Sequence, residues 1–430
     1  MVIKTSTVFK VILFVVAMFM LEYFNMFFPS ISVSVSRITL GSTAILLALI
    51  TLLFSANNPT MKHQLRFANL FFMLYIPVVL VSAVLSFVWY KYSFSSILPV
   101  CAPFFYPLYA YPLIYIFSWD NTYEKYLKKI VALVLIMLAL KAFSWYMYNY
   151  RGTVFFSNLL FKHDEGWVRN GMLRVDTGAL YGIALCYLLF IFFARKKHRG
   201  ALLAGGMILF AVFITQYRYL EIVIILVGLI IYLTSSVSDK KKLIRILILS
   251  ALVLVFIAVG GLDAILSSFS VDNSETGSST SARIETIDFF WSLMNGTRFF
   301  FGFGYLSTYS TTAVELITRS ATEVYWLEDI GILGGFYMFG LMSLLIYLPL
   351  FYRSVKACAV SVKNKCSDKA FLSAIVGYML ISCIMLNIFD RQRVFDTAFY
   401  ISLISFISAN DELSIQNDLS QRRSLLPPSS

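Results

Sequence analysis

Charged residues are scarce in this chain of 430 residues. Asp, Glu, Lys and Arg make up 13% of it, whereas soluble domains carry about 25%. Hydrophobic residues make up 59% and aromatic residues 17%, so the composition excludes a water-soluble protein. The net charge of +12 does not indicate a nucleic-acid partner, because the basic residues are spread over the connections between apolar runs.

Cysteine and histidine are also few, with five and three residues. Cys101, Cys186 and Cys383 fall within apolar runs, and Cys358 and Cys366 lie in one basic connection. This placement argues against a disulfide framework outside the cytosol. The longer polar connections hold no compact group of His, Asp or Glu at ligand spacing, so we expect neither a metal nor another cofactor.

Long apolar runs dominate the chain. About twelve stretches of roughly 16–25 residues carry almost no charge, and a bilayer core takes about 20 helical residues to cross. Apolar runs of this length indicate helices, which satisfy their own backbone polar groups in lipid. We therefore predict an all-α, polytopic integral membrane protein. The expected spans are 8–28, 38–56, 67–89, 96–117, 127–148, 175–194, 200–215, 222–237, 246–266, 330–352, 371–389 and 396–409.

The domain organisation follows from these spans. Residues 1–410 form a single transmembrane domain, and the polar residues 411–430 are expected to be a disordered cytosolic tail. The first run contains Glu22 and has no small-residue cleavage site, so it is predicted to be a span rather than a signal peptide. The fourth span carries Pro99, Pro103, Pro107 and Pro112, which remove helix hydrogen bonds and predict a kink.

The orientation follows from Lys and Arg in the connections. With the N-terminus inside, the cytosolic connections carry roughly twice as many basic residues as the outer ones. Dense clusters at Arg195–Arg199 and Lys240–Lys242 support this orientation. Both termini are then cytosolic, and 149–174 and 267–329 become large extracytoplasmic loops.

The larger outer loop contains an amphipathic stretch. Ile284, Ile287, Phe290, Trp291 and Met294 recur at helical spacing among charged residues. This pattern predicts a helix that lies on the bilayer surface or packs on its own protein, and both interpretations remain open.

The first candidate for chemistry is the short hairpin Gln216–Glu221. Arg218 lies at its centre, near the outer hydrocarbon edge, where an arginine is costly and a functional role is the default. Its guanidinium offers a planar fork of donors that suits phosphate. The structural alternative is an ion pair with Glu221 on the same helical face.

The second candidate is a series of short motifs in the larger outer loop. Ser281-Ala-Arg283 is followed by Gly302-Phe-Gly304, and then by the acidic segment Glu323–Asp329 before Gly331-Ile-Leu-Gly334. The glycines alone are consistent with close helix packing. The order of the motifs, together with an outer-edge arginine that opens a span, resembles the O-antigen polymerase/O-antigen ligase superfamily.

The resemblance implies a GT-C-like, metal-independent, inverting glycosyltransferase in the bacterial inner (cytoplasmic) membrane. Its donor and acceptor would be glycan repeat units on undecaprenyl diphosphate, used at the periplasmic face to build O-antigen of lipopolysaccharide or an exopolysaccharide. Membrane lipid and a chain-length regulator protein would be its other partners.

The resemblance also implies roles for particular residues. Arg218 and Arg283 correspond in position to the family arginines that hold the lipid diphosphate. Glu323 or Asp329 would be the catalytic base, since an acceptor hydroxyl needs one nearby. The other basic residues expected to bind substrate are Arg169, Arg174 and Arg319.

Several other functions remain open. An O-antigen ligase transfers the glycan to lipid A core, but members carry a His in the larger loop and this chain has none in 267–329. A lipid-linked oligosaccharide flippase would share the substrate. A twelve-span carrier of the major-facilitator type is disfavoured, because residues 57–66 lack an Asp-Arg-x-Gly-Arg-like motif. A purely structural or assembly protein is the last alternative.

Overall fold

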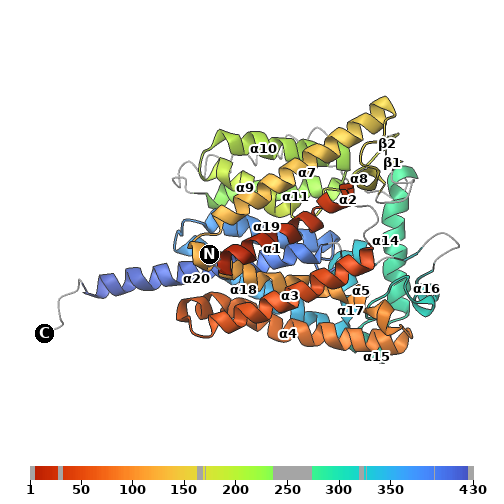
Figure 1. The fold of residues 1–430 in the computed structure, drawn as a ribbon, viewed down its shortest axis with the longest axis horizontal. Coiled ribbons are helices and arrows are strands. Elements are labelled where there is room, and N and C mark those ends of the chain that lie inside the picture. The colour runs from red at the N-terminus through yellow and green to blue at the C-terminus, as the bar shows by residue number, and fades with distance from the viewer. Residues whose placement is uncertain are drawn as a thin grey trace, which may run out of the picture.

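The computed structural model describes residues 5–27, 32–161, 168–169, 171–235, 274–318, 324–325, 327–391 and 393–424. Over these ranges the chain is almost entirely helical, as expected (Figure 1). The exception is a small antiparallel hairpin in which Val168 pairs with Leu173 and Arg169 with Met172. The predicted span 246–266 lies outside the described residues.

The elements follow one another along the chain in this order. The first half contains α1 (Thr5–Met20), α2 (Tyr23–Phe27), α3 (Val33–Ser55), α4 (Pro59–Trp89), α5 (Phe94–Cys101), η1 (Ala102–Tyr109), α6 (Ala110–Asp120), α7 (Glu124–Arg151), α8 (Ser157–Leu160), β1 (Val168–Arg169), β2 (Met172–Leu173), α9 (Tyr181–Phe193), α10 (His198–Leu209) and η2 (Phe210–Thr215). The second half contains α11 (Arg218–Thr234), α14 (Ser274–Ser292), α15 (Gly296–Phe301), α16 (Thr311–Ile317), η3 (Leu327–Asp329), α17 (Gly331–Phe339), η4 (Gly340–Met342), α18 (Ser343–Lys363), α19 (Lys369–Met385) and α20 (Val394–Ser424).

The protein is a polytopic membrane protein. Six helical segments among the described residues are long and apolar enough to cross a bilayer, namely 33–55, 59–89, 94–120, 124–151, 198–215 and 331–363. Four shorter apolar helices, at 5–20, 181–193, 219–234 and 369–384, lie where further spans were predicted.

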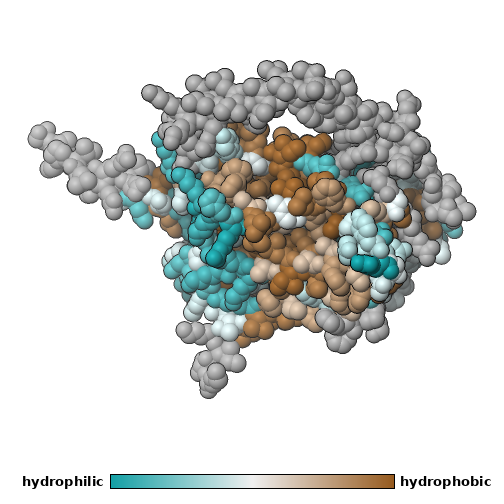
Figure 2. All heavy atoms as spheres, turned by 90° about the horizontal axis from the view of Figure 1, so that it is seen from above, coloured by the Kyte–Doolittle hydropathy of each residue, from teal (hydrophilic) through white to brown (hydrophobic). Residues whose placement is uncertain are grey.

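The outer surface of the helix bundle is apolar. Large side chains such as Leu53, Leu202 and Ile225 are between 69% and 78% exposed, which is costly in water and favourable in lipid. Figure 2 shows hydrophobic side chains across the middle of the visible face, with hydrophilic residues on either side of them. This distribution is the one expected of a bundle embedded in a bilayer.

The proline-rich fourth span is broken, in agreement with the predicted kink. The α-helix α5 gives way to a tighter 3-10 segment, η1, before α6 resumes the α-helical geometry. Proline removes the N–H that an α-helix needs and favours such a change. The span is nonetheless central to the bundle, because η1 packs against both α3 and α20.

The predicted outer loops lie at one end of the bundle. The hairpin β1–β2 and α14 appear together at the right-hand end of Figure 1, opposite the end at which α1 begins. Helix α14 runs across the ends of the other helices (Figure 1). Phe290 is fully buried against Phe303 and Tyr337, whereas Ile284 and Trp291 are exposed. Packing on its own protein is therefore observed for one side of this amphipathic helix.

The tail differs from its prediction. Residues 411–424, expected to be disordered, continue α20 as a helix that projects from the bundle (Figure 1). Extending an existing helix needs no new nucleus, which explains how a polar segment remains helical there. Glu412 also approaches His63 of α4 at 3.4 Å.

Candidate functional site

The main candidate site is a cavity of about 270 Å³ at the end of the bundle that carries the predicted outer loops. It lies among α1, α2, α3, η1, the segment before α9, the start of α11 and the turn before α20. Its lining residues are Phe19, Met20, Glu22, Asn25, Val33, Ser36, Arg37, Leu40, Pro103, Tyr106, Asp176, Thr177, Gly178, Ala179, Tyr217, Tyr219, Arg391 and Arg393.

Three arginines give one side of this cavity a positive charge. Arg37 comes from the second turn of α3, while Arg391 and Arg393 come from the short turn between α19 and α20. Arg37 forms no ion pair with any other residue that the structure describes. The charge of Arg391 acts on it directly, so two like charges face the same space. A bound anion would relieve their repulsion.

The turn before α20 is held by buried polar contacts. Asp390 is fully buried, accepts a hydrogen bond from the backbone N–H of Arg393 at 3.0 Å and pairs with the Arg393 guanidinium. The Nε of Arg391 lies 2.7 Å from Oε1 of Glu328. These contacts fix both arginines at the cavity edge, which is the preorganisation that binding of a charged group requires.

Glu328 is paired with Arg391, although it does not itself line the cavity. Burial raises the pKa of Glu328 to about 7, and Asp390 and Asp329 add to the rise while Arg391 opposes it. A carboxylate with a pKa near the working pH has the property required of a general base. Glu328 lies in the acidic segment noted in the sequence, next to the predicted Asp329.

A buried ion triad contributes two carboxylates, Glu22 and Asp176, to the cavity lining. Lys141 of α7 is 1% exposed, and its Nζ lies 2.9 Å from Glu22 and 2.6 Å from Asp176. The predicted first span is interrupted at this point, because α1 ends at Met20 and Glu22 has a φ of 68°. The break turns the Glu22 carboxylate toward Lys141, so the structure pairs two intramembrane charges that the sequence leaves unassigned.

Two tyrosines connect the cavity to the predicted arginines. The rings of Tyr217 and Tyr219 lie 5.6 Å apart at the start of α11, and Arg174 approaches the Tyr217 ring at 5.9 Å. The charges of Arg283, Asp329 and Arg393 all act on Tyr219. Arg174 thus lies near Tyr217, and Arg283 and Asp329 lie near Tyr219, although none of the three lines the cavity.

The other predicted residues are placed only in part. Arg218 is the first residue of α11, between the two cavity tyrosines, and Arg169 lies in β1, but their side chains are outside the described part of the chain. Arg319 and Glu323 lie entirely outside it. Arg298 of the same loop stacks on Phe303 at 4.9 Å and does not line the cavity.

The glycine motifs have a packing role. A Cβ on Gly304 would lie 2.3 Å from Oγ of Ser86, and one on Gly334 would lie 1.9 Å from the Leu327 carbonyl oxygen. The backbone N–H of Gly304 also donates to the carbonyl of Met338 at 2.9 Å. These contacts hold the larger loop against α4 and α17. Close packing is therefore enough to explain why these positions are glycine, with no ligand required.

Arg37, Arg391, Arg393 and Glu328 were not singled out from the sequence. The signal was present for the arginines, because each lies at the outer edge of a predicted span, as Arg218 does. An arginine near the hydrocarbon edge is costly at each of these positions, so the same argument that favours a functional role for Arg218 also applies to them. The pairing of Glu328 with Arg391 joins residues far apart in the chain and had no sequence signal.

The cavity is thus lined by charges of both signs and bordered by the apolar residues Phe19, Met20, Val33 and Leu40. Within the described ranges, no group of three or more His, Cys, Asp or Glu residues is arranged to hold a metal ion. The positive charge comes from arginines, and it suits phosphate or another anion. The chain matches no protein-family model and no curated protein.

Proposed function

We propose that the protein is a glycosyltransferase that polymerises oligosaccharide repeat units carried on a polyprenyl diphosphate. The observation that carries this proposal is the cavity lined by Arg37, Arg391 and Arg393 at the end of a membrane-embedded bundle. Arginines bind phosphate oxygens through bidentate hydrogen bonds. A lipid diphosphate would meet them at the depth of the headgroups while its chain stays in the bilayer.

The surroundings of the arginines suit both ends of such a donor. Phe19, Met20 and Val33 on α1 and α3 provide apolar contact beside the charged groups. Glu22, Asn25 and Thr177 in the same lining offer hydrogen-bonding groups for sugar hydroxyls. The cavity therefore offers apolar contact for the lipid part of a lipid-linked glycan and polar contact for its sugars.

The chemistry follows from this placement. An acceptor sugar hydroxyl attacks the anomeric carbon of the donor glycan, and a new carbon–oxygen bond forms as the bond to the diphosphate oxygen breaks. The diphosphate leaves with the electron pair, and the arginines stabilise its charge. The hydroxyl proton passes to a carboxylate, for which Glu328 is our first candidate and Asp329 the second. Inversion at the anomeric carbon follows from a single displacement.

The donor itself would prepare the base. Arg391 is paired with Glu328 in the absence of substrate. A diphosphate offers Arg391 a competing partner of higher charge, which would weaken its hold on Glu328 and make that carboxylate a better proton acceptor.

Polymerase is favoured over ligase because 267–329 contains no His. This proposal includes the finer architecture expected from the sequence, with about twelve spans and a GT-C-like arrangement in a bacterial inner membrane. It also includes cytosolic termini and a cavity that faces the periplasm.

The test is polymer formation by the purified protein in detergent with polyprenyl-diphosphate-linked repeat units. A flippase has no membrane to act across in detergent, so products of two or more repeat units would support the polymerase. Intact repeat units after prolonged incubation with active, monodisperse protein would contradict it. Transfer to added lipid A core, with no repeat-unit polymer, would indicate the ligase.

A further inference from the structure

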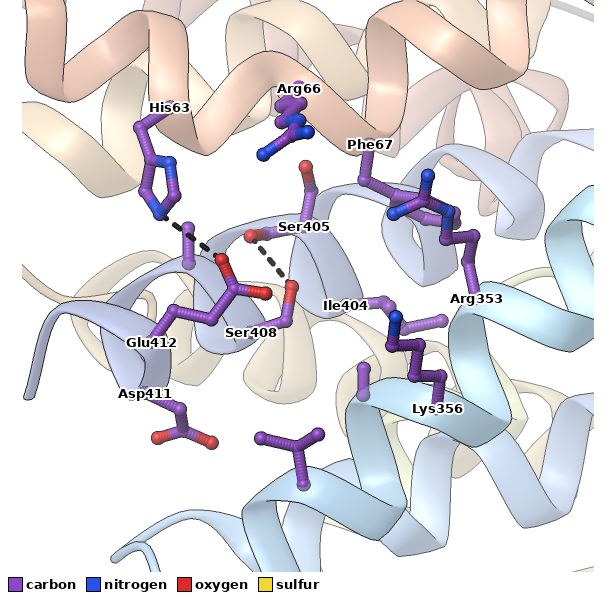
Figure 3. A pocket seen from close by; sticks show the side chains of 13 residues that line it. His63, Arg66, Phe67, Arg353, Lys356, Ile404, Ser405, Ser408, Asp411 and Glu412 are labelled. Carbon is purple, nitrogen blue, oxygen red and sulfur yellow. Dashed lines mark hydrogen bonds and ion pairs between the residues drawn. The ribbon is translucent and has the colours of Figure 1, made fainter. Parts of the chain in front are cut away.

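A second charged hollow lies at the opposite end of the bundle, where the predicted cytosolic connections are. It has a volume of about 90 Å³ and is formed by α4, α18 and α20 (Figure 3). Its lining residues are His63, Arg66, Phe67, Arg353, Lys356, Ala357, Val360, Ile404, Ser405, Ser408, Ala409, Asp411 and Glu412.

The cations Arg66, Arg353 and Lys356 outnumber the two carboxylates that line this hollow, Asp411 and Glu412. Arg66, Arg353 and Lys356 form no ion pair with any residue in the described ranges, although the chain forms such pairs elsewhere at this end, as between Arg195 and Glu124. Of the two nearby carboxylates, Glu412 approaches His63 at 3.4 Å, and Asp411 points away from the three cations (Figure 3). The hydroxyl of Ser408, which lies between α4 and α18 in the same view, donates to the backbone carbonyl of Ser405 at 3.3 Å.

The position of the cations selects the kind of anion. Arg66 immediately precedes the predicted span 67–89, and Arg353 immediately follows 330–352, so both lie where helices leave the hydrocarbon. Basic pockets between transmembrane helices at this depth bind the headgroups of anionic lipids. A phosphate at this height would neutralise the like charges that converge there.

The helices also offer a path for acyl chains. Met73, Leu80 and Val84 follow Arg66 at helical spacing along α4 and are between 49% and 65% exposed. Leu348, Tyr352 and Val355 form a similar exposed stretch on α18, beside Arg353 and Lys356, and are between 49% and 65% exposed. The charged hollow therefore continues into two apolar surfaces, which a free phosphate would not need and a phospholipid would.

We propose that this hollow is a binding site for the phosphate headgroup of an anionic phospholipid, contacted by Arg66, Arg353 and Lys356. The site is separate from the arginine cavity and does not depend on the proposed glycosyltransferase activity. Its ligand would tie together α4, α18 and α20, the elements that converge there.

The experiment measures lipid binding to the full-length protein in detergent. Phosphatidylglycerol, phosphatidylcholine and inorganic phosphate are titrated separately, with bound lipid counted by native mass spectrometry and thermal unfolding recorded in parallel. The variants are the triple substitution Arg66→Gln, Arg353→Gln, Lys356→Gln and a matched triple, Lys62→Gln, Lys363→Gln, Lys365→Gln. The matched lysines are exposed at the same end and lie outside the hollow.

We expect phosphatidylglycerol to bind and to raise the unfolding temperature, with little effect of phosphatidylcholine. The hollow triple should weaken phosphatidylglycerol binding by roughly 100-fold, since each basic residue at a membrane surface contributes about 1 kcal/mol, which is about a fivefold factor. The matched triple should bind nearly as the natural protein does. Equal losses in the two triples would overturn the proposal, and so would equal protection by inorganic phosphate, which would indicate a soluble anion.

Discussion

At the scale of single residues, the arginine cavity combines fixed cations with a carboxylate of altered acidity. Arg391 and Glu328 are 2.7 Å apart, and they come from segments that the sequence separates by about 60 residues. Under the proposed function, Glu328 would accept the proton of the acceptor hydroxyl and the arginines would stabilise the leaving diphosphate.

Glu328 makes the proposed mechanism pH-dependent. Burial raises the pKa of Glu328 to about 7, so the group is protonated and unable to accept a proton below that pH. Polymer formation should therefore rise with pH through about 7. Glu328→Gln should lower the rate by about 100-fold or more and flatten this part of the profile. The measurement is the initial rate between pH 5.5 and 8.5.

The matched control for this variant is Glu315→Gln, which changes an exposed carboxylate of α16 in the same loop. A Glu328→Gln enzyme with natural rates and the natural pH profile would assign the base elsewhere, and Asp329 would be tested next.

Lys141 is expected to matter for stability. It is 1% exposed and is paired with both Glu22 and Asp176, so Lys141→Met would leave two carboxylates without their cation. Breaking a buried pair costs about 3–5 kcal/mol. The unfolding temperature of the purified protein should fall clearly, as measured by intrinsic fluorescence during heating.

The control for this prediction lies on the same helix. Lys128 is 60% exposed and pairs with Glu124 at the helix surface, so Lys128→Met should change stability by less than about 1 kcal/mol. Equal shifts for the two variants would show that the Lys141 triad contributes no more than a surface pair.

At the scale of elements, sequence periodicity predicted most helices and the amphipathic α14, because apolar runs and helical spacing are local properties. The break in the fourth span was also predictable, since proline acts on its own turn. The interruption of the first span at Glu22 was not, because it depends on Lys141 more than 100 residues away. The helical course of residues 411–424 does not follow from their polar composition, because that composition is also typical of disordered segments.

The site was predictable in the same uneven way. Arg283 and Asp329 belong to local motifs and Arg174 to a basic loop, and all three lie near cavity tyrosines without lining the cavity. Arg37 comes from α3, whereas Arg391 and Arg393 come from the turn before α20, and the packing of α3 and α20 against η1 brings them near one another. A single sequence does not specify that packing, because lipid-facing and protein-facing apolar residues look alike in it.

The junction between η3 and α17 offers a test of the packing role of the glycines. Gly331 has a φ of +60°, and a Cβ there would lie 2.2 Å from the carbonyl oxygen of Ile384. Gly331→Ala should therefore destabilise the protein by roughly 1–3 kcal/mol. Gly228→Ala in α11 is the control, because nothing lies within 4 Å of its Cβ position and alanine favours a helix. An unfolding temperature of Gly331→Ala equal to or higher than that of Gly228→Ala would contradict this role.

At the scale of the whole molecule, the two charged hollows lie at opposite ends of the bundle. The arginine cavity is at the end with α14 and the β hairpin. The charged hollow formed by α4, α18 and α20 is at the end where α20 projects. This separation matches a protein that uses one membrane face for chemistry and the other for anchoring to lipid.

The orientation of the molecule is testable by reporter fusions. We expect fusions after Lys242 and after Ser430 to report the cytosol, and one near Ser279 to report the periplasm. The reason is that Lys and Arg are concentrated in the connections on the same side as Lys242 and Ser430. A cytosolic signal near Ser279 would place the arginine cavity on the wrong face for a periplasmic polymerase.

The most direct test of the central claim is the rate of polymer formation by purified Arg37 variants. Arg37 lines the cavity and has no ion pair within the described part of the chain, so its replacement leaves no buried carboxylate uncompensated. Arg298→Ala is the matched control, since that arginine lies at the same end but stacks on Phe303 away from the cavity. Arg218→Ala and Arg283→Ala extend the test to the arginines selected from the sequence.

We predict that Arg37→Ala lowers the rate by about 100-fold or more, as removal of one transition-state donor does. Arg37→Lys should recover only part of the loss, because it keeps the charge without the planar fork, and Arg298→Ala should remain close to the natural rate. Near-normal polymer formation by Arg37→Ala, Arg218→Ala and Arg283→Ala at equal protein amounts would contradict the claim that this cavity holds the diphosphate.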